Sequence, residues 1–314
     1  MRTSDDTRAE VGPGVLTDPD WVVPPVPQDV PEGGMAWLWA RVARFSSGEA
    51  HVRRRALAVG PLGGGEAADA LRDAARVRTE ALLEGAGPGT VDVMTRVARV
   101  VPVEVLADFV GLPVTAETAG LVGHVAGAYH AHGETVPAAD RALARLVTVC
   151  GGAWDEATAA RIGLLVQAYD ATAGLIGNAA HRMLSGGTGD TGDTGDTGSA
   201  RRTGGTPQGS AGSAADVVTA SLDRTLSADL PVRGTLRAPA DGGDPVRIAL
   251  FTEDGSLAFG AGPHACPGRA HARALATGVL DALLVRGCRL VRPDLAYEPS
   301  ANLRVPVRLE VTCA

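Results

Sequence analysis

One glycine-rich loop, LAFGAGPHACPG at residues 257–268, constrains this chain more than any other stretch, because it presents a single cysteine at fixed spacing from an aromatic residue and a histidine. Its informative positions are Phe259, Gly260, Gly262, His264, Cys266 and Gly268. Glycines let a backbone turn tightly and approach a flat ligand closely. An apolar helical pattern, ALATGVLDALL, follows directly. A thiolate at the start of such a helix, where the amide end favours negative charge, suits an axial ligand of haem iron.

The spelling of this loop resembles the haem-thiolate loop of the cytochrome P450 family, whose pattern all six positions match. The resemblance implies haem b as cofactor and Cys266 as the ligand of its iron. It also implies that the other five positions contribute to the haem site. The alternative is a glycine-rich loop that holds a buried, inert cysteine.

Composition limits the class of protein. A chain of 314 residues, with 45% hydrophobic and 21% charged residues, can fold as an ordinary globular protein. A net charge of −7 argues against a nucleic-acid partner. No apolar run is long enough for a membrane span, and the N-terminus lacks the apolar core of a secretory signal, so we expect a cytoplasmic protein with no membrane partner. The four cysteines lack zinc-type spacing, and nothing in the sequence favours disulfides.

Basic residues in two further segments resemble positions that bind the haem propionates in the family. His51 and Arg55, in the stretch HVRRR, are four residues apart and would project from one face of a helix. Arg237, in ADLPVRGTLR, takes the place of another propionate-binding arginine. We expect Arg53 and Arg54 to point elsewhere and to bind nothing special. The alternative for this helix is a solvated basic face.

A long helical pattern runs from residue 154 to residue 184 without proline and would span about 45 Å. It resembles the family's central helix, which crosses the distal face of the haem. Asp170 then falls on the family's catalytic acid, and Ala171 replaces the hydroxyl residue that normally follows it. Thr172 offers a hydroxyl about 100° further round the helix, so we expect it to point away from the iron. The alternative for Asp170 is a charge that faces solvent.

Other segments carry less chemistry. Residues 185–214 are a Gly-Thr-Asp repeat with too few apolar side chains to bury, which predicts a flexible loop within the domain. We expect three histidines in the preceding helical region to be surface or cavity-lining residues, because their spacing does not suit a paired metal site. They are His124, His130 and His132.

The chain departs from the family pattern in three places. The elements that precede the proline-rich segment at residues 15–34 are expected to be missing. Arg224 and Ser227 replace the glutamate and arginine of the ExxR pair, which removes a fixed buried network. Only 21 residues separate Arg237 from Phe259, so we expect a deletion after about Leu250.

Together these features predict a mainly α fold with a small β part: a reduced, P450-like helical domain around haem that spans residues 1–314. The resemblance implies a haem-thiolate oxidoreductase of the monooxygenase type, which acts on a small molecule or natural-product intermediate. Electrons would come from a separate, ferredoxin-type partner, because the chain has no flavin or iron–sulfur motif. The alternatives are a haem enzyme that is peroxide-driven or does not oxygenate, and a non-catalytic partner of a biosynthetic enzyme.

Overall fold

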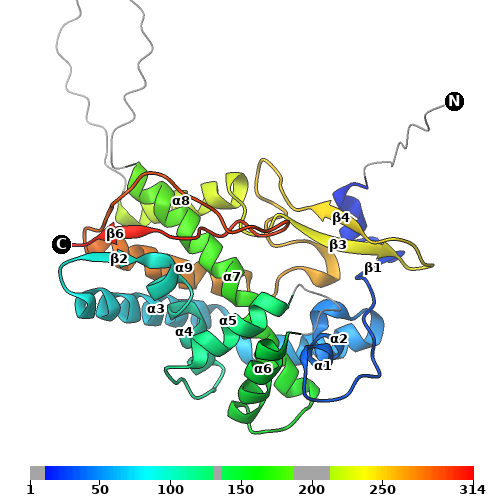
Figure 1. The fold of residues 1–314 in the computed structure, drawn as a ribbon. Helices are drawn as coiled ribbons and strands as arrows, with labels where there is room; N and C mark the ends of the chain where they lie inside the picture. The colour runs from blue at the N-terminus through cyan, green and yellow to red at the C-terminus, as the bar shows by residue number, and fades with distance from the viewer. Residues whose placement is uncertain (1–10, 130–135, 187–212) are drawn as a thin grey trace, which may run out of the picture.

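The computed structural model describes residues 11–129, 136–186 and 213–314 (Figure 1). As predicted, the fold is mainly α with a small β part. The main helices are α1 (Met35–Arg41), α2 (Gly48–Val59), α3 (Gly65–Ala86), α4 (Val101–Phe109), α5 (Thr118–Ala128), α6 (Pro137–Val149), α7 (Glu156–Ser185), α8 (Ala214–Ala228) and α9 (Arg269–Val285). Short helical segments are η1 (Pro13–Leu16), η2 (Ala43–Phe45), η3 (Gly60–Leu62), η4 (Met94–Ala98) and η5 (Gly262–His264).

Helix α7 is the element around which the others are arranged, and Figure 1 shows it in green through the middle of the molecule. Its 30 residues contain no proline, and the side chain of Asp155 caps its start by accepting a hydrogen bond from the Thr158 N–H at 2.7 Å. Most of its residues are buried, because it packs against α2, α4, α5, α8 and α9. The helix predicted at residues 154–184 is therefore confirmed to within two residues at its start and one at its end.

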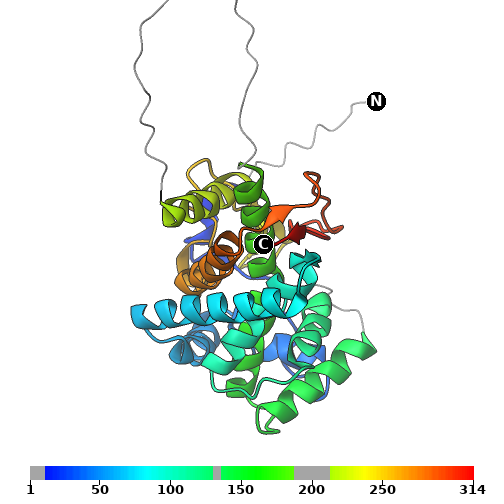
Figure 2. The same cartoon turned by 90° about the vertical axis from the view of Figure 1, so that its left-hand side faces the viewer.

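Helices α3 and α9 pack against each other more extensively than any other two described helices. Figure 2 shows α3 in cyan lying across α9 in orange. A Cβ added at Gly278 of α9 would overlap the carbonyl oxygen of Arg72 in α3, so glycine is what permits the approach. The carboxylate of Asp281 in α9 accepts hydrogen bonds from the Arg72 guanidinium at 2.7 and 2.9 Å. This pair fixes the helix that begins immediately after the cysteine loop.

Two small antiparallel sheets lie at opposite sides of the molecule in Figure 1. One has the order β1 (Trp21–Val22), β3 (Gly234–Pro239), β4 (Val246–Ala249), and the other has the order β2 (Thr90–Asp92), β6 (Glu310–Thr312), β5 (Arg289–Leu290). In the first sheet Thr235 is paired with Ile248, which sets Arg237 opposite Val246. Strand β4 has four residues.

The hydrophobic core has two parts that α7 joins. The N-terminal half of α7 packs with α1, α4, α5 and α6, and its C-terminal half packs with α3, α8, α9 and the β2–β6–β5 sheet. The break between the parts falls near the middle of α7, at residues 167–172. That stretch is where a large cavity touches the helix.

Two expectations are corrected by the fold. Cys288 and Cys313 form a disulfide, because the turn after α9 and the end of β6 come together, which no sequence spacing indicated. Of the loop predicted at 185–214, residues 187–212 lie outside the described residues, while Ser185 still belongs to α7 and Ala214 already belongs to α8. Within the described part of the chain, no helix is long and apolar enough to cross a membrane.

Candidate functional site

A cavity of about 910 Å³ lies between the cysteine loop, α2, the middle of α7, the β3–β4 hairpin and the proline-rich segment at residues 23–27. This volume is at the upper end of the ~300–1,000 Å³ typical of ligand sites. Most of its lining is apolar. The face of α7 that borders it presents Leu164, Gln167, Ala168, Ala171, Thr172 and Leu175. These positions follow the three- and four-residue spacing of one helix face.

The cysteine loop reaches this cavity through a series of backbone turns. Gly260 has φ +70° and Gly262 has φ +68°, a conformation that other residues rarely adopt. The N–H of Cys266 donates to the carbonyl of Phe259 at 2.8 Å, which closes the loop. Phe259, Gly260, His264, Cys266 and Gly268 all border the cavity, so the structure brings these predicted residues together.

Gly262 is a partial exception to the prediction. It is absent from the cavity wall, and a Cβ there would overlap the carbonyl oxygen of Leu16 in η1. Its lack of a side chain therefore lets the N-terminal segment pack against the loop, rather than letting a ligand approach. Gly268, which precedes α9, has no atom within 4 Å of an added Cβ. The two glycines belong to one motif, but only at Gly262 does the packing of the protein require the absence of a side chain.

The thiol of Cys266 is accessible, but the space it faces is the cavity, so protein surrounds it on most sides. Burial raises the pKa of this thiol. The backbone N–H of Gly268 and the guanidinium groups of Arg55 and Arg44 act in the opposite direction. Without a cation the protonated form is favoured, and coordination to a metal ion is what would stabilise the thiolate.

The predicted propionate-binding residues converge beside the cysteine loop. The rings of His51 and His264 lie 4.0 Å apart between centroids, and Arg55 donates to the carbonyl of Ala265 at 2.7 Å. Arg237 is only 4% exposed and donates to the hydroxyl of Thr235 and to a backbone carbonyl. His51 and Arg55 come from α2 and Arg237 from β3, so the site joins segments far apart in the chain.

Electrostatics make this end of the cavity positive. Burial, followed by the charges of Arg55 and Arg237, lowers the pKa of His51. Burial, followed by His51 and the same arginines, lowers the pKa of His264 to about 3, so both imidazoles are neutral near pH 7. The described residues that line the cavity include Arg44, Arg55, Arg237 and Arg247 but no aspartate or glutamate. The site is therefore complementary to a ligand with more than one negative charge.

The central-helix pair is divided between two spaces. Thr172 is 2% exposed and lines the large cavity together with Ala171, and the expectation that its hydroxyl points away from the iron stays a prediction. Asp170 does not line that cavity. Its carboxylate lies 3.4 Å from the guanidinium of Arg99, which also binds Glu298 at 2.7 Å.

Asp170 instead borders a side cavity of about 50 Å³, whose wall shares Gln167 and Ala171 with the large cavity. Burial raises the pKa of Asp170, and the charge of Arg99 partly offsets this effect. Asp170 is thus a half-buried, paired acid next to the large cavity, neither free in solvent nor directly within the cavity.

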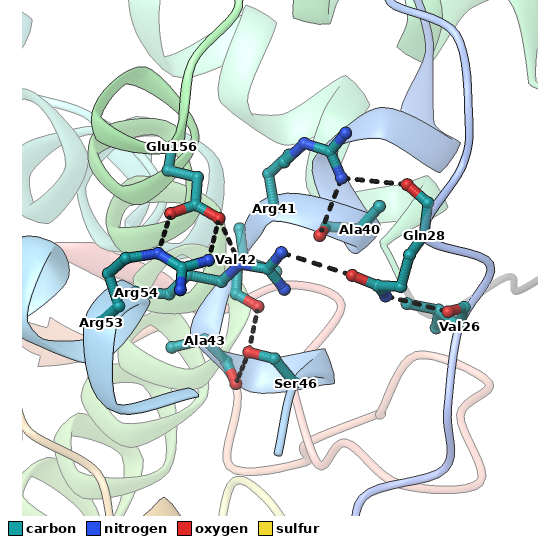
Figure 3. A network of polar contacts seen from close by, with 10 residues as sticks. All are labelled: Val26, Gln28, Ala40, Arg41, Val42, Ala43, Ser46, Arg53, Arg54 and Glu156. Atoms are coloured by element: carbon teal, nitrogen blue, oxygen red, sulfur yellow. Dashed lines mark hydrogen bonds and ion pairs between the residues drawn. The ribbon is translucent and has the colours of Figure 1, made fainter. Parts of the chain in front are cut away.

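Arg53 and Arg54 do have partners, which corrects the prediction that they bind nothing special. Figure 3 shows both guanidinium groups donating to the carboxylate of Glu156 at the start of α7, at 2.8–3.0 Å. Arg54 is 5% exposed and also donates to the side chain of Gln28 at 3.3 Å. The network ties α2 to α7 and to the proline-rich wall, and so fixes the helix that carries His51 and Arg55.

Arg224 and Ser227, at the ExxR positions, form no ion pair among the described residues, but the adjacent Asp223 of α8 binds Arg273 of α9 at 2.6 Å. The hydroxyl of Ser227 donates to the carbonyl of Arg224 at 3.3 Å. The chain that enters the cysteine loop packs on α8 through its backbone instead: a Cβ on Gly255 would lie 3.0 Å from the carbonyl oxygen of Leu226. Gly255 also has φ +66°, so this contact depends on glycine.

Sequence reasoning missed Arg44 and Asn302, which line both the large and the side cavity. Neither belongs to a recognisable motif. His124 is exposed, with a ring nitrogen 2.8 Å from the carbonyl of Gly120, whereas His130 and His132 lie outside the described residues. Within the described ranges, no group of three or more His, Cys, Asp or Glu residues is placed to hold a metal ion.

No family model matches the sequence, and no curated protein matches it either. Solved structures do resemble the fold. P450BioI, in complex with an acyl carrier protein ligated to hexadec-9Z-enoic acid, has a TM-score of 0.75 at 17% identity, over 96% of this chain and 90% of that one. The cytochrome P450 PksS of the Bacillus subtilis 168 bacillaene polyketide synthase has a TM-score of 0.69 at 17% identity, over 96% and 88%.

CYP154A1 from Streptomyces coelicolor A3(2) gives a TM-score of 0.63 at 22% identity, over 96% of this chain and 89% of that chain. These similarities extend over nearly the whole chain. The protein therefore has the cytochrome P450 fold, and the resemblance of its cysteine loop is matched by its architecture.

Proposed function

We propose that the large cavity holds haem b with the Cys266 thiolate as axial ligand, and that the protein is a haem-thiolate oxidoreductase of the monooxygenase type. One observation carries the proposal: a single cysteine borders a large apolar cavity whose one end is lined by arginines without any carboxylate. Apolar walls suit the porphyrin ring, and the arginines suit its two propionates.

The residues present fit this cofactor at its charged edge. The Nε2 atom of His51 is buried without a hydrogen-bond partner in the described structure, which costs free energy unless a ligand oxygen satisfies it. Arg237 is buried without an acidic partner, and burial lowers its pKa. A propionate at this position would satisfy both groups. His51, Arg55, Arg237 and His264 are therefore assigned to the propionates.

A haem held by a thiolate supplies oxygen-activating chemistry, because the thiolate donates electron density to the iron and favours O–O cleavage. The chain's own residues then have separate tasks. The loop from Phe259 to Gly268 holds the thiolate in place, and the apolar walls exclude water. The Thr172 hydroxyl holds a proton within the large cavity, and Asp170 supplies protons through the side cavity.

The substrate we propose is a small-molecule or natural-product intermediate, bound on the α7 side of the cavity. Two of the similar structures are of proteins described with an acyl carrier protein or as part of a polyketide synthase, which supports a biosynthetic intermediate. Oxygen-driven turnover would require a separate, ferredoxin-type redox partner.

The test is the absorption spectrum of the purified, reduced protein with carbon monoxide, together with its haem content. We expect one haem per chain and the spectrum characteristic of thiolate ligation. Protein that binds no haem when reconstituted, or that gives the spectrum of a histidine-ligated haem, would overturn the proposal.

A peroxide-driven reaction is the second candidate. The observation that favours it is the placement of Asp170, which is paired with Arg99 and lies outside the large cavity. Peroxide already carries the electrons and protons that oxygen must receive. The rates of product formation with hydrogen peroxide and with reductant plus oxygen distinguish the two candidates.

A further inference from the structure

Arg44 has no polar partner although it lies in the cavity wall. It belongs to η2, between α1 and α2, and it borders both the large and the side cavity. No hydrogen bond or ion pair joins it to the described residues, and its Nε atom is buried and unsatisfied. Its guanidinium carbon lies 5.6 Å from the ring centroid of Phe45. An arginine held in this way is a costly feature unless an anion binds it.

The neighbouring arginines are different, because each has a partner within the protein. Arg41 donates to the carbonyl of Gln28, Arg55 to that of Ala265, and Arg237 to Thr235. Asp170, the acid that lines the side cavity together with Arg44, is already held by Arg99. Among the described residues, Arg44 is thus the arginine of the cavity wall whose guanidinium makes no hydrogen bond to the protein.

A second donor lies at the same junction. Asn302 borders both cavities, and its side-chain oxygen accepts from Arg247 at 2.9 Å, so its amide N–H groups remain available for a ligand. Leu164 and Ala168 on the α7 wall also border the large cavity and supply apolar surface there. The junction therefore offers charged and amide donors at one end of an apolar surface.

We propose that the substrate is an amphipathic carboxylic acid whose carboxylate binds Arg44, with Asn302 as a second donor, and whose apolar body lies along the face of α7 at Leu164 and Ala168. This inference rests on the proposed function, because it names the substrate class of the same site. An Arg–carboxylate pair of this kind selects for charge as well as for length. The haem propionates are the competing source of a carboxylate for Arg44, and the experiment is designed to separate the two.

The test measures binding of dodecanoic acid and of its neutral analogue dodecanamide to the full chain by equilibrium dialysis, with haem content measured on each preparation. We expect the acid to bind about tenfold or more tightly than the amide, the range for a hydrogen bond to a charged group. Arg44→Gln should bring that ratio close to one, leave amide binding unchanged and leave haem content unchanged. Arg44→Lys, which keeps the charge, should retain part of the preference.

Arg41→Gln is the matched control, because it removes an arginine three residues away that lines neither cavity, and it should leave the acid–amide ratio intact. The inference is overturned if wild-type protein does not distinguish acid from amide, or if Arg41→Gln rather than Arg44→Gln removes the preference. It is also overturned if Arg44→Gln loses haem while the acid–amide ratio persists, since Arg44 would then be a propionate ligand. Failure of the proposed function is read separately, as absence of haem from the wild-type chain.

Discussion

The cysteine-loop wall and the α7 wall of the cavity are built in different ways. The loop is held by its own backbone: glycines with positive φ, the hydrogen bond from Cys266 to Phe259, and the contact of Arg55 with Ala265. The α7 wall is held in place by the packing of a long helix. Whether one of its residues can act in the cavity depends on whether its side chain faces that cavity. The predicted residues of the loop lie together at the cavity, whereas Asp170 of α7 is paired with Arg99 outside it.

This difference teaches that the two requirements of the proposed chemistry respond differently to sequence change. Binding of the cofactor depends on a local backbone path that few substitutions preserve. Proton supply depends on one or two side chains and on their partners. We therefore expect substitutions in the loop to abolish cofactor binding completely, and substitutions on α7 to reduce proton supply by degrees.

The largest expected effect is at Cys266. Cys266→Ser removes the thiolate, so the reduced protein with carbon monoxide should lose the thiolate-type spectrum completely. Cys150→Ser is the control, because Cys150 is the other free cysteine and lies outside the cavity wall. An unchanged spectrum in Cys266→Ser would mean that another residue is the iron ligand. The cysteine loop would then not be the wall that binds the cofactor.

The second effect concerns proton supply on the α7 wall. With oxygen we expect a poor yield of product per reductant consumed. With hydrogen peroxide we expect roughly tenfold faster turnover, a smaller factor than a positioned acid contributes to a rate. Ala171→Thr should raise the oxygen-driven yield, because residue 171 faces the cavity. Asp170→Asn should lower the oxygen-driven rate and leave the peroxide-driven rate unchanged. Efficient, coupled turnover with oxygen by the wild-type protein would show that the α7 wall is complete as it stands.

The third effect compares two glycines of the loop. Gly262→Ala forces a side chain into the left-handed region and against the carbonyl of Leu16, so we expect a loss of about 3 kcal/mol of unfolding free energy. Gly268→Ala meets no atom within 4 Å and has φ −90°, so its unfolding free energy should change little. Urea denaturation of both variants measures this. Equal effects would mean that the loop is not fixed by its backbone path in the way the structure indicates.

The smallest effect is at the ion-pair network that ties α2 to α7. Glu156→Gln leaves the buried Arg54 without its anion, and we expect a loss of about 2 kcal/mol of unfolding free energy. The control is Glu49→Gln, on an exposed position of α2 that makes no ion pair in the described residues.

The pH dependence of the wild type follows from the same carboxylate. The hydrogen bond from Arg53, with further help from Arg54, lowers the pKa of Glu156 from 4.5 to about 2. Because this pKa is depressed in the folded state, its stabilising contribution is complete above pH 4.5 and is lost as the pH falls toward 2. Stability in that range should therefore fall less steeply in Glu156→Gln than in the wild type. If the unfolding free energies of the two proteins changed equally with pH, Glu156 would not be the carboxylate that causes this pH dependence.

The sequence by itself determined the features that are local in the chain. The spacing of Phe259, His264 and Cys266 with the glycines predicted one loop, and the absence of proline between residues 154 and 184 predicted one long helix. Both depend on backbone conformation over a few turns, for which neighbouring residues carry most of the information. The mainly α fold and the matching cytochrome P450 architecture follow from these elements.

Only the tertiary structure decided which charged groups meet. Asp170 is paired with Arg99, 71 positions away, and Arg99 with Glu298, 199 positions further. Arg54 lies buried beside Glu156, and Arg44 lines the cavity although it belongs to no recognisable motif. An ion pair depends on distance and burial in three dimensions, and the same arginine is a surface charge or a ligand contact according to the helices packed around it.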